Sequence, residues 1–155
     1  MSLKIDTFSN KTGGNAFYKA LAHPVAGDLA GPFLAALKAA GPVAIYDPVG
    51  GAQAFDALYP LADIALDGLY VQDIEEIGAE RLGLIAQPVT ALTESKARTL
   101  LVTAFDAARL IDHIRHLIPA GMQVHSLDAL RLPEALLTDK RRYLNPLNFA
   151  TNFAF

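Results

Sequence analysis

A short apolar run that ends in an acid, a proline and two glycines constrains this chain more than any other feature. The run is Val43–Tyr46, and the turn that follows spans residues 47–51. A continuous apolar run of this length is expected for a strand that is buried on both faces of a sheet. The paired glycines permit a tight turn into a following helix. This unit is typical of the first strand and helix of an α/β domain.

Helical and strand-like segments alternate through most of the chain. The predicted helices cover residues 16–22, 28–40, 52–61 and 107–118, with Asn15, Asp28 and Asp106 as caps, and residues 74–82 form a short helix or turn. The predicted strands cover residues 43–46, 69–71, 84–86, 99–104 and 123–127. Strands separated by helices predict right-handed crossovers and a mainly parallel sheet. We expect one three-layer Rossmann-like α/β domain of about five strands over residues 15–132, after a flexible arm at 1–14 and before an extension at 133–155.

Composition narrows the classes of partner. The chain of 155 residues has a formal net charge of −3 and no cysteine, which excludes disulfides and thiolate metal sites. An acidic balance argues against a nucleic-acid partner, and the basic cluster at 140–142 is interpreted as a solvated connection. No apolar run approaches the ~20 residues that span a bilayer, and the N-terminus lacks a secretory leader pattern. We therefore expect no membrane partner and a cytoplasmic location.

The carboxyl ends of parallel strands are where ligands bind in open α/β sheets. The candidate ligand-binding residues at these ends are Asp47, Gly50, Gly51, Ala52, Asp73, Ala104 and Phe105. Free amides at the start of the helix after residue 51 would attract a phosphate. Asp73 stands where an acid binds a ribose hydroxyl in dinucleotide sites, with Asp67 as the competing candidate. The ligand class these positions predict is a nucleotide or nucleotide-sugar.

A second interpretation of the same turn stays open. The full G-x-G-x-x-G fingerprint is missing, and Asp47 and Pro48 stand where its first glycine belongs. A carboxylate there would face an incoming phosphate. On this interpretation, Gly50 and Gly51 serve only the dihedral angles of a tight strand-to-helix turn.

No set of residues forms a recognisable catalytic or metal centre. Ser95 and Ser126 lack the glycine-flanked turn of a hydrolase nucleophile. His113 and His116 are predicted on the solvated side of their helix, and His125 is predicted to pack inside the last strand. We expect no metal and no complete active site in this chain.

The C-terminal segment ends in an unusual concentration of aromatic residues, with Phe149, Phe153 and Phe155 among the last seven positions. Chain ends are usually polar and frayed. Two explanations remain open: the segment folds back on the domain, or it begins a second domain. Residues 143–155 are the candidate contact with a second copy or a second domain.

Four short motifs, at residues 43–51, 69–73, 87–92 and 100–105, resemble the Rossmann-like N-terminal domain of bacterial sugar O- and N-acyltransferases. They are also similar to the C-terminal domain of sugar C-methyltransferases. The shared features are a glycine turn after strand one, an acid after strand two, a Pro-Val element and a Val-x-Ala strand. The resemblance implies nucleotide-sugar binding with Gly50 and Gly51 at phosphate and Asp73 near ribose or base. Asp47 departs from the pattern, and no hexapeptide repeat follows Pro133.

Two functions follow as hypotheses. The first is a nucleotide or nucleotide-sugar binding module that forms the N-terminal part of a larger sugar-modifying protein. The second is a non-catalytic structural or assembly domain that has the fold and lacks the ligand site. An enzyme with an NAD cofactor ranks third, because it requires the cleaner glycine fingerprint.

Overall fold

The structure, a computed structural model, describes residues 10–131, with the backbone alone described for residues 10–15. The helices are α1 (Asn10–Ala22), α2 (Pro24–Ala39), α3 (Ala52–Leu58) and α4 (Ala108–Ile114), with 3₁₀ helices η1 (Ile74–Glu76), η2 (Val89–Glu94), η3 (Arg115–Leu117) and η4 (Leu127–Leu130). The strands are β1 (Val43–Tyr46), β2 (Leu66–Val71), β3 (Glu80–Arg81), β4 (Leu84–Pro88), β5 (Thr99–Val102) and β6 (Gln123–Ser126). The predicted α/β class is confirmed.

The strands form one sheet in the order β3-β4-β2-β1-β5-β6. Five strands are parallel, and β3 pairs antiparallel with β4 at one edge. The prediction of about five mainly parallel strands is confirmed, and the antiparallel edge strand is an addition to it. Strand order reverses at β1, which pairs with β2 on one side and with β5 on the other.

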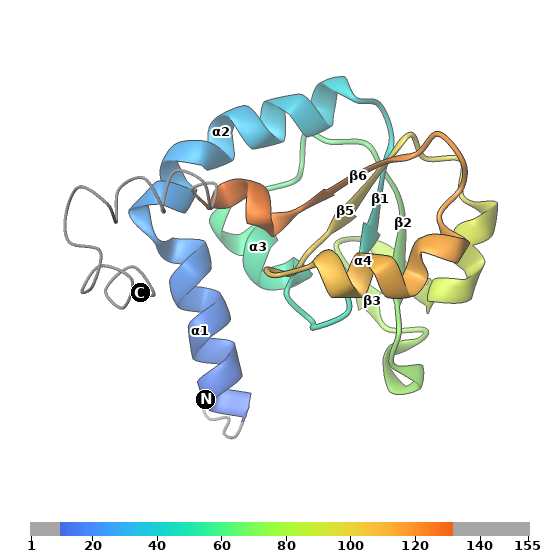
Figure 1. The fold of residues 1–155 in the computed structure, drawn as a ribbon, viewed down its shortest axis with the longest axis horizontal. Coiled ribbons are helices and arrows are strands. Elements are labelled where there is room, and N and C mark those ends of the chain that lie inside the picture. Colours follow the sequence, from blue (N-terminus) through green and yellow to red (C-terminus); the bar gives the residue numbers. More distant parts are fainter. Residues whose placement is uncertain (1–9, 132–155) are drawn as a thin grey trace.

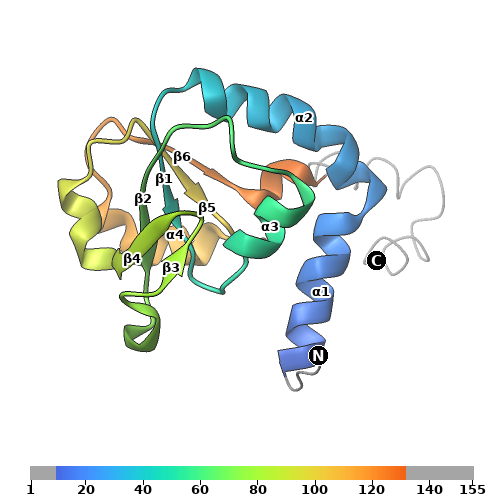
Figure 2. The ribbon, with the colours of Figure 1, turned by 180° about the vertical axis from the view of Figure 1, so that it is seen from behind.

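Helices cover both faces of the sheet and make three layers (Figures 1 and 2). Alternate side chains of β1 point to opposite faces: Val43 and Ile45 join the core under α2 and α3, whereas Ala44 and Tyr46 join the core under α4. All four are fully buried. This two-sided burial is why the strand is a continuous apolar run.

The predicted flexible arm at 1–14 is wrong for residues 10–14, because α1 begins at Asn10. The C-terminal half of α1 is anchored through the buried Leu21 and the half-buried Phe17. Extending an existing helix costs far less than nucleating one, so anchored turns support the turns before them. The N-terminal part of α1 projects past the sheet in both views (Figures 1 and 2).

The predicted cap of the second helix is also wrong. Helix α2 begins at Pro24, and the Nδ1 atom of His23 accepts a hydrogen bond from the Val25 amide (3.1 Å). Proline is favoured at the first helical position, where its missing N–H costs nothing. Asp28 and Pro32 therefore lie inside the helix.

The other boundaries differ by a few residues. Helix α3 ends at Leu58 rather than at 61, because Pro60 disfavours the helical conformation of Tyr59. The Asp56 carboxylate accepts the Leu61 amide (2.8 Å) beyond the helix end. The predicted extension at 133–155, including the candidate contact at 143–155, lies outside the described residues.

None of the helices within residues 10–131 combines the length and the apolar composition that a membrane span requires. The pair Ala16–Ala22 and Pro24–Ala39 passes the length and composition test together, with a bend of 68° between its two helices.

Candidate functional site

The turn at residues 47–51 lies at the carboxyl end of β1, where the strand order of the sheet reverses. The carboxyl end of β5 lies beside it, since Tyr46 and Val102 are register partners. Open α/β sheets bind their ligands at such a reversal. The expected position of the turn, at the carboxyl end of a central parallel strand, is confirmed.

The Asp47 carboxylate occupies the centre of this turn. Its side chain is fully buried. Its Oδ1 atom accepts hydrogen bonds from the Ala52 amide (3.1 Å) and from the Thr103 hydroxyl (2.7 Å). The Ala52 amide is the first N–H of α3, which is the donor that we had predicted for a phosphate. In this structure a carboxylate of the same chain takes that place.

Arg81 approaches the same carboxylate from β3. Its Nη1 atom lies 3.7 Å from Asp47 Oδ2, and its Nη2 atom forms an ion pair with Glu76. Asp47 Oδ2 and Arg81 Nη1 are both buried and have no hydrogen-bond partner. The two atoms attract each other by charge, and the distance between them is too long for a hydrogen bond. No local pattern points to Arg81, because residues 74–82 are predicted as a short helix or turn, whereas Arg81 lies on the edge strand β3.

The two glycines of the turn serve different purposes. Gly50 has φ +75°, a left-handed conformation that glycine adopts without strain, and it is exposed with no other residue within 4 Å of the place of a Cβ. Gly51 has φ −90° and does not need glycine for its dihedral angles. A Cβ on Gly51 would lie 2.8 Å from Cε1 of Phe17. The close approach at Gly51 is thus made by α1 of this chain.

Besides the contact between Phe17 and Gly51, aromatic side chains pack against one another over the turn. The rings of Phe17 and Phe105 meet edge to face, with centroids 5.5 Å apart. The Arg131 guanidinium lies 4.6 Å from the centroid of the Phe105 ring, at the end of the described chain. Phe105, a predicted ligand-binding residue, therefore packs between α1 and the residue that follows η4.

The start of α4 is capped in the same manner from a distant segment. Asp106 was predicted as the cap, and this is wrong: Asp106 is exposed with φ +53°. The Asp128 carboxylate instead accepts the amides of Asp106 (2.7 Å) and Ala107 (3.0 Å). Ala104, another predicted site residue, is buried in the core under α4. Both helices that begin at the reversal thus have an internal carboxylate at their amino ends.

The remaining sequence candidates have local roles. Asp73 lies two residues beyond β2, is exposed, and its Oδ1 atom accepts the Glu75 amide (3.0 Å) at the start of η1. His113 and His116 are exposed, in agreement with the predicted solvated face. His125 is half-buried in β6 with its ring 6.3 Å from that of Phe33, in agreement with a packed histidine.

Tyr46 ends β1 on the opposite face of the sheet from Asp47. Its hydroxyl donates to Oε1 of Gln72 (2.5 Å), the residue after β2. Burial raises the pKa of Tyr46 above its ordinary value, because a buried phenolate is poorly solvated. The phenol is therefore a neutral hydrogen-bond donor.

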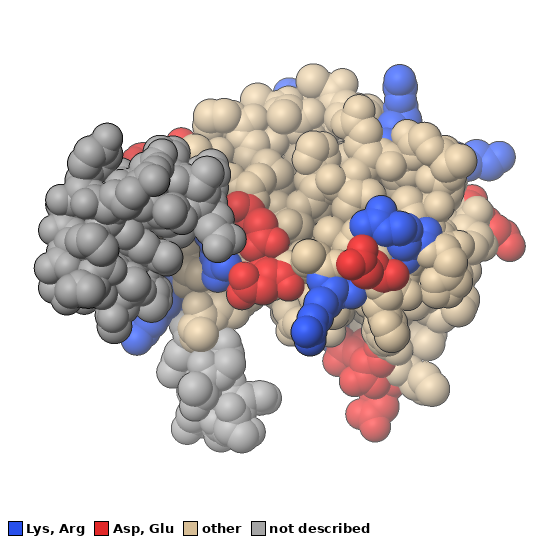
Figure 3. Space-filling view, in the orientation of Figure 1, with Lys and Arg blue, Asp and Glu red and all other residues tan. Residues whose placement is uncertain are grey.

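Metal-binding groups and charged surfaces add little to the site. Within the described part of the chain, no three His, Cys, Asp or Glu residues are grouped to hold a metal ion. On the face shown in Figure 3, positive and negative side chains of the coloured residues are interspersed and form no continuous basic stripe.

No family model matches this chain, and no curated protein matches it. Solved structures with some likeness include the crystal structure of RSP, a Rex-family repressor (TM-score 0.41, 13% identity). Two others are RSP in complex with β-NADH (0.40, 12%) and RSP in complex with β-NAD⁺ and operator DNA (0.44, 12%). The matches cover 72%, 72% and 83% of this chain, and 63%, 64% and 69% of the respective RSP chains.

This chain therefore spans a little under two thirds of the first RSP chain that it matches. Likeness at this level says nothing about what the chain binds. The strand order and helical layers establish the Rossmann-like fold that the resemblance implied. The link to sugar acyltransferases or methyltransferases remains a prediction.

Proposed function

We propose that this chain is a non-catalytic structural domain of Rossmann-like fold, in which the chain's own groups fill the usual ligand position. The observation that carries the proposal is the hydrogen bond from the Ala52 amide to the buried carboxylate of Asp47. Phe17 closes the turn from outside, and Asp128 caps α4. The carboxyl edge of the sheet then serves to hold α1 and the outgoing segment at Arg131 against the domain.

Electrostatics favours this proposal over phosphate binding at the same turn. Two unit negative charges about 4 Å apart repel by roughly 4 kcal/mol at an effective dielectric constant of 20. The attraction of a helix amino end for an anion is only about 0.3–1 kcal/mol. Arg81 is shared between Asp47 and Glu76, so these three side chains keep a net charge of −1, and this charge opposes a phosphate at Ala52.

Isothermal titration calorimetry of the full chain with ADP, UDP-glucose, NADH and inorganic phosphate tests this proposal. We expect no binding by the wild-type protein at about 1 mM ligand, a concentration at which a Kd corresponds to a binding free energy of only ~4 kcal/mol. The matched variant is Asp47→Asn, which keeps the shape and removes the negative charge. It should bind phosphate more tightly than the wild type does. Saturable binding of any nucleotide by the wild type would overturn the proposal.

A second candidate function is binding of a nucleotide or nucleotide-sugar, as the module of a larger sugar-modifying protein. The observation that favours it is Arg81, whose buried Nη1 atom lacks a hydrogen-bond partner beside the turn. Gly50 leaves its backbone exposed on the same turn. A phosphate would bind here if α1 moved away and Arg81 exchanged Asp47 for the ligand.

The variant Phe17→Ala separates the two candidates. It removes the ring that closes Gly51 and leaves Asp47 and Arg81 in place. If α1 is a displaceable cover, this variant should gain affinity for UDP-glucose or ADP, and the double variant Phe17→Ala/Arg81→Gln should lose that gain. If the turn is a purely structural feature, Phe17→Ala lowers stability and binds neither ligand.

A further inference from the structure

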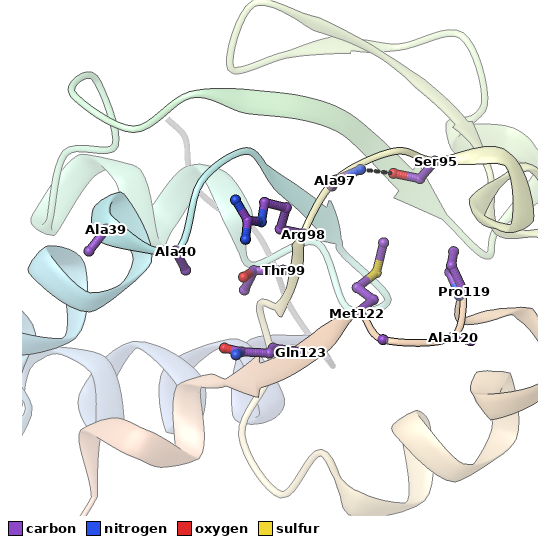
Figure 4. A pocket seen from close by; sticks show the side chains of 11 residues that line it. Ala39, Ala40, Ser95, Ala97, Arg98, Thr99, Pro119, Ala120, Met122 and Gln123 are labelled. Carbon is purple, nitrogen blue, oxygen red and sulfur yellow. Dashed lines mark hydrogen bonds between the residues drawn. The ribbon is translucent and has the colours of Figure 1, made fainter.

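A pocket of about 450 Å³ lies at the opposite edge of the sheet, at the amino ends of β5 and β6. Its walls come from the end of α2, the segment before β5 and the loop before β6 (Figure 4). The residues that line it include Ala39, Ala97, Arg98, Thr99, Met122 and Gln123. This pocket is separate from the turn at residue 47, which lies at the carboxyl edge.

Arg98 supplies the pocket with one positive charge. It is the only charged residue among those that line the pocket. The side-chain stem of Arg98 packs on Gly41, where a Cβ would lie 2.8 Å from Cδ. Within residues 10–131, Arg98 forms no ion pair. Arg98 is exposed, so its guanidinium donors face the solvent-filled pocket and are open to another group.

Thr99 adds a polar atom that the fold does not use. Thr99 is fully buried, and its Oγ1 atom has no hydrogen-bond partner. Leaving a buried hydroxyl without a partner is unfavourable, so such atoms are rare in stable folds. Figure 4 shows the side chains of Arg98, Thr99 and Gln123 in a row on the same side of β5 and β6, facing the end of α2.

We propose that this pocket binds a small monocarboxylate with an apolar body. The planar guanidinium of Arg98 matches the two oxygens of a carboxylate, and the Thr99 hydroxyl and Gln123 amide supply further donors. Ala39, Ala97 and Met122 provide apolar contacts for the body of the ligand. One cation beside the negatively polarised carboxyl end of α2 suits a single negative charge better than a phosphate dianion.

NMR titration of the full chain with benzoate and hexanoate tests the proposal, with benzamide and inorganic phosphate as comparison ligands. We expect saturable shifts of the Arg98, Thr99 and Gln123 amides within about 50 mM benzoate, the weak range usual for a ligand of so few atoms. Benzamide and phosphate should bind more weakly than benzoate.

Two variants in the pocket and one control on α4 locate the site. Arg98→Gln should weaken benzoate binding about tenfold or more, the loss expected for a charge-assisted hydrogen bond. Arg109→Gln on α4 removes the same charge from an exposed position and should leave binding unchanged. Thr99→Val should weaken binding several-fold, by about the worth of one neutral hydrogen bond, without lowering the melting temperature.

Three results would overturn the proposal. The first is an absence of saturable shifts with benzoate and hexanoate in the folded wild type. The second is equal binding of benzamide or tighter binding of phosphate, which would remove the carboxylate as the recognised group. The third is an equal effect of Arg98→Gln and Arg109→Gln, which would reduce the shifts to a general charge effect.

Discussion

The polar groups at the two edges of the parallel sheet differ in whether they have partners within the chain. At the carboxyl edge, the Ala52 and Ala107 amides donate to carboxylates of the same chain, and an aromatic ring closes the turn. At the amino edge, a guanidinium and a buried hydroxyl line a pocket without a partner from the described residues. The edge where α/β sheets usually bind ligands is the one that this chain fills from within.

The contrast shows that fold and strand order alone do not identify a ligand site. Parallel strands and helix starts create donors at the carboxyl edge in every domain of this architecture. Whether those donors face a ligand depends on the side chains around them. In this chain they are Asp47 within the turn itself, and Asp128 and Phe17 from distant segments.

The largest expected effect is at Asp47. Asp47→Ala removes the acceptor of two hydrogen bonds and leaves Arg81 without its buried counter-charge. We expect a loss of about 3–5 kcal/mol in the free energy of unfolding, the usual cost of breaking a buried pair. Urea denaturation measures it, with Asp63→Ala at an exposed loop position as the control. A loss below about 1 kcal/mol would mean that the carboxyl edge is not held by this residue.

The next effect tests how tightly α1 closes the turn. Gly51→Ala places a methyl group against the Phe17 ring and should cost about 1–3 kcal/mol, the range for overpacking a core. Adding Phe17→Ala should recover part of that loss, because the clash disappears. Additive effects of the two substitutions in urea denaturation would contradict the contact between α1 and the turn.

Asp128 accepts the amides at the start of α4, whereas the sequence pattern predicts Asp106 as the cap of that helix, and substitutions at the two residues distinguish these roles. Asp128→Ala removes the acceptor at the start of α4 and should destabilise by about 1–2 kcal/mol. Asp106→Gly loses an exposed ion pair with Arg131 and relieves a left-handed backbone, so its net effect should lie within about 0.5 kcal/mol. Thermal denaturation followed by circular dichroism measures both. The reverse order would restore Asp106 as the cap.

At the amino edge, Thr99→Val should stabilise the protein, whereas Asp47→Ala, Gly51→Ala and Asp128→Ala should destabilise it. It removes a buried hydroxyl that has no partner, and we expect a gain of about 1 kcal/mol in the free energy of unfolding. Urea denaturation without added ligand measures it. A loss of similar size would indicate that the hydroxyl already has a partner in the folded protein.

The smallest effect concerns alkaline pH. Burial raises the pKa values of Tyr46 and Tyr59 in the folded protein. These two phenols therefore stay protonated to a higher pH in the folded protein than in the unfolded chain. Their contribution to stability is complete below the ordinary tyrosine pKa of about 10 and is lost as the pH rises through the folded values. Tyrosinate absorbance should therefore rise later in the folded than in the unfolded protein. Coincident curves would contradict the burial of both phenols.

The features of the fold that depend on residues close together in the chain could be predicted from the sequence. The unbroken apolar run at β1 marks a strand buried on both faces, and the glycines after it mark the turn into α3. Patterns of this kind depend on neighbours in the chain. Because β1 is central, the location of its turn at the reversal of strand order followed as well.

The side chains that fill the site could not be predicted in the same way. Asp47 was recognised as an obstacle to phosphate binding, whereas Phe17, Arg81 and Asp128 reach the carboxyl edge from segments that no local pattern connects to it. Asp106 looked like a helix cap because it precedes the helix. The cap comes instead from Asp128, 22 residues further along the chain.

The most direct test of the account follows the Ala52 amide by NMR while ADP, UDP-glucose, NADH or phosphate is added to the full chain. If Asp47 holds this amide, its signal stays unmoved and its hydrogen exchange stays slow at every ligand concentration. A saturable shift of the Ala52 signal would show that the amide is released to a ligand, and the claim that this chain fills its own ligand position would be wrong.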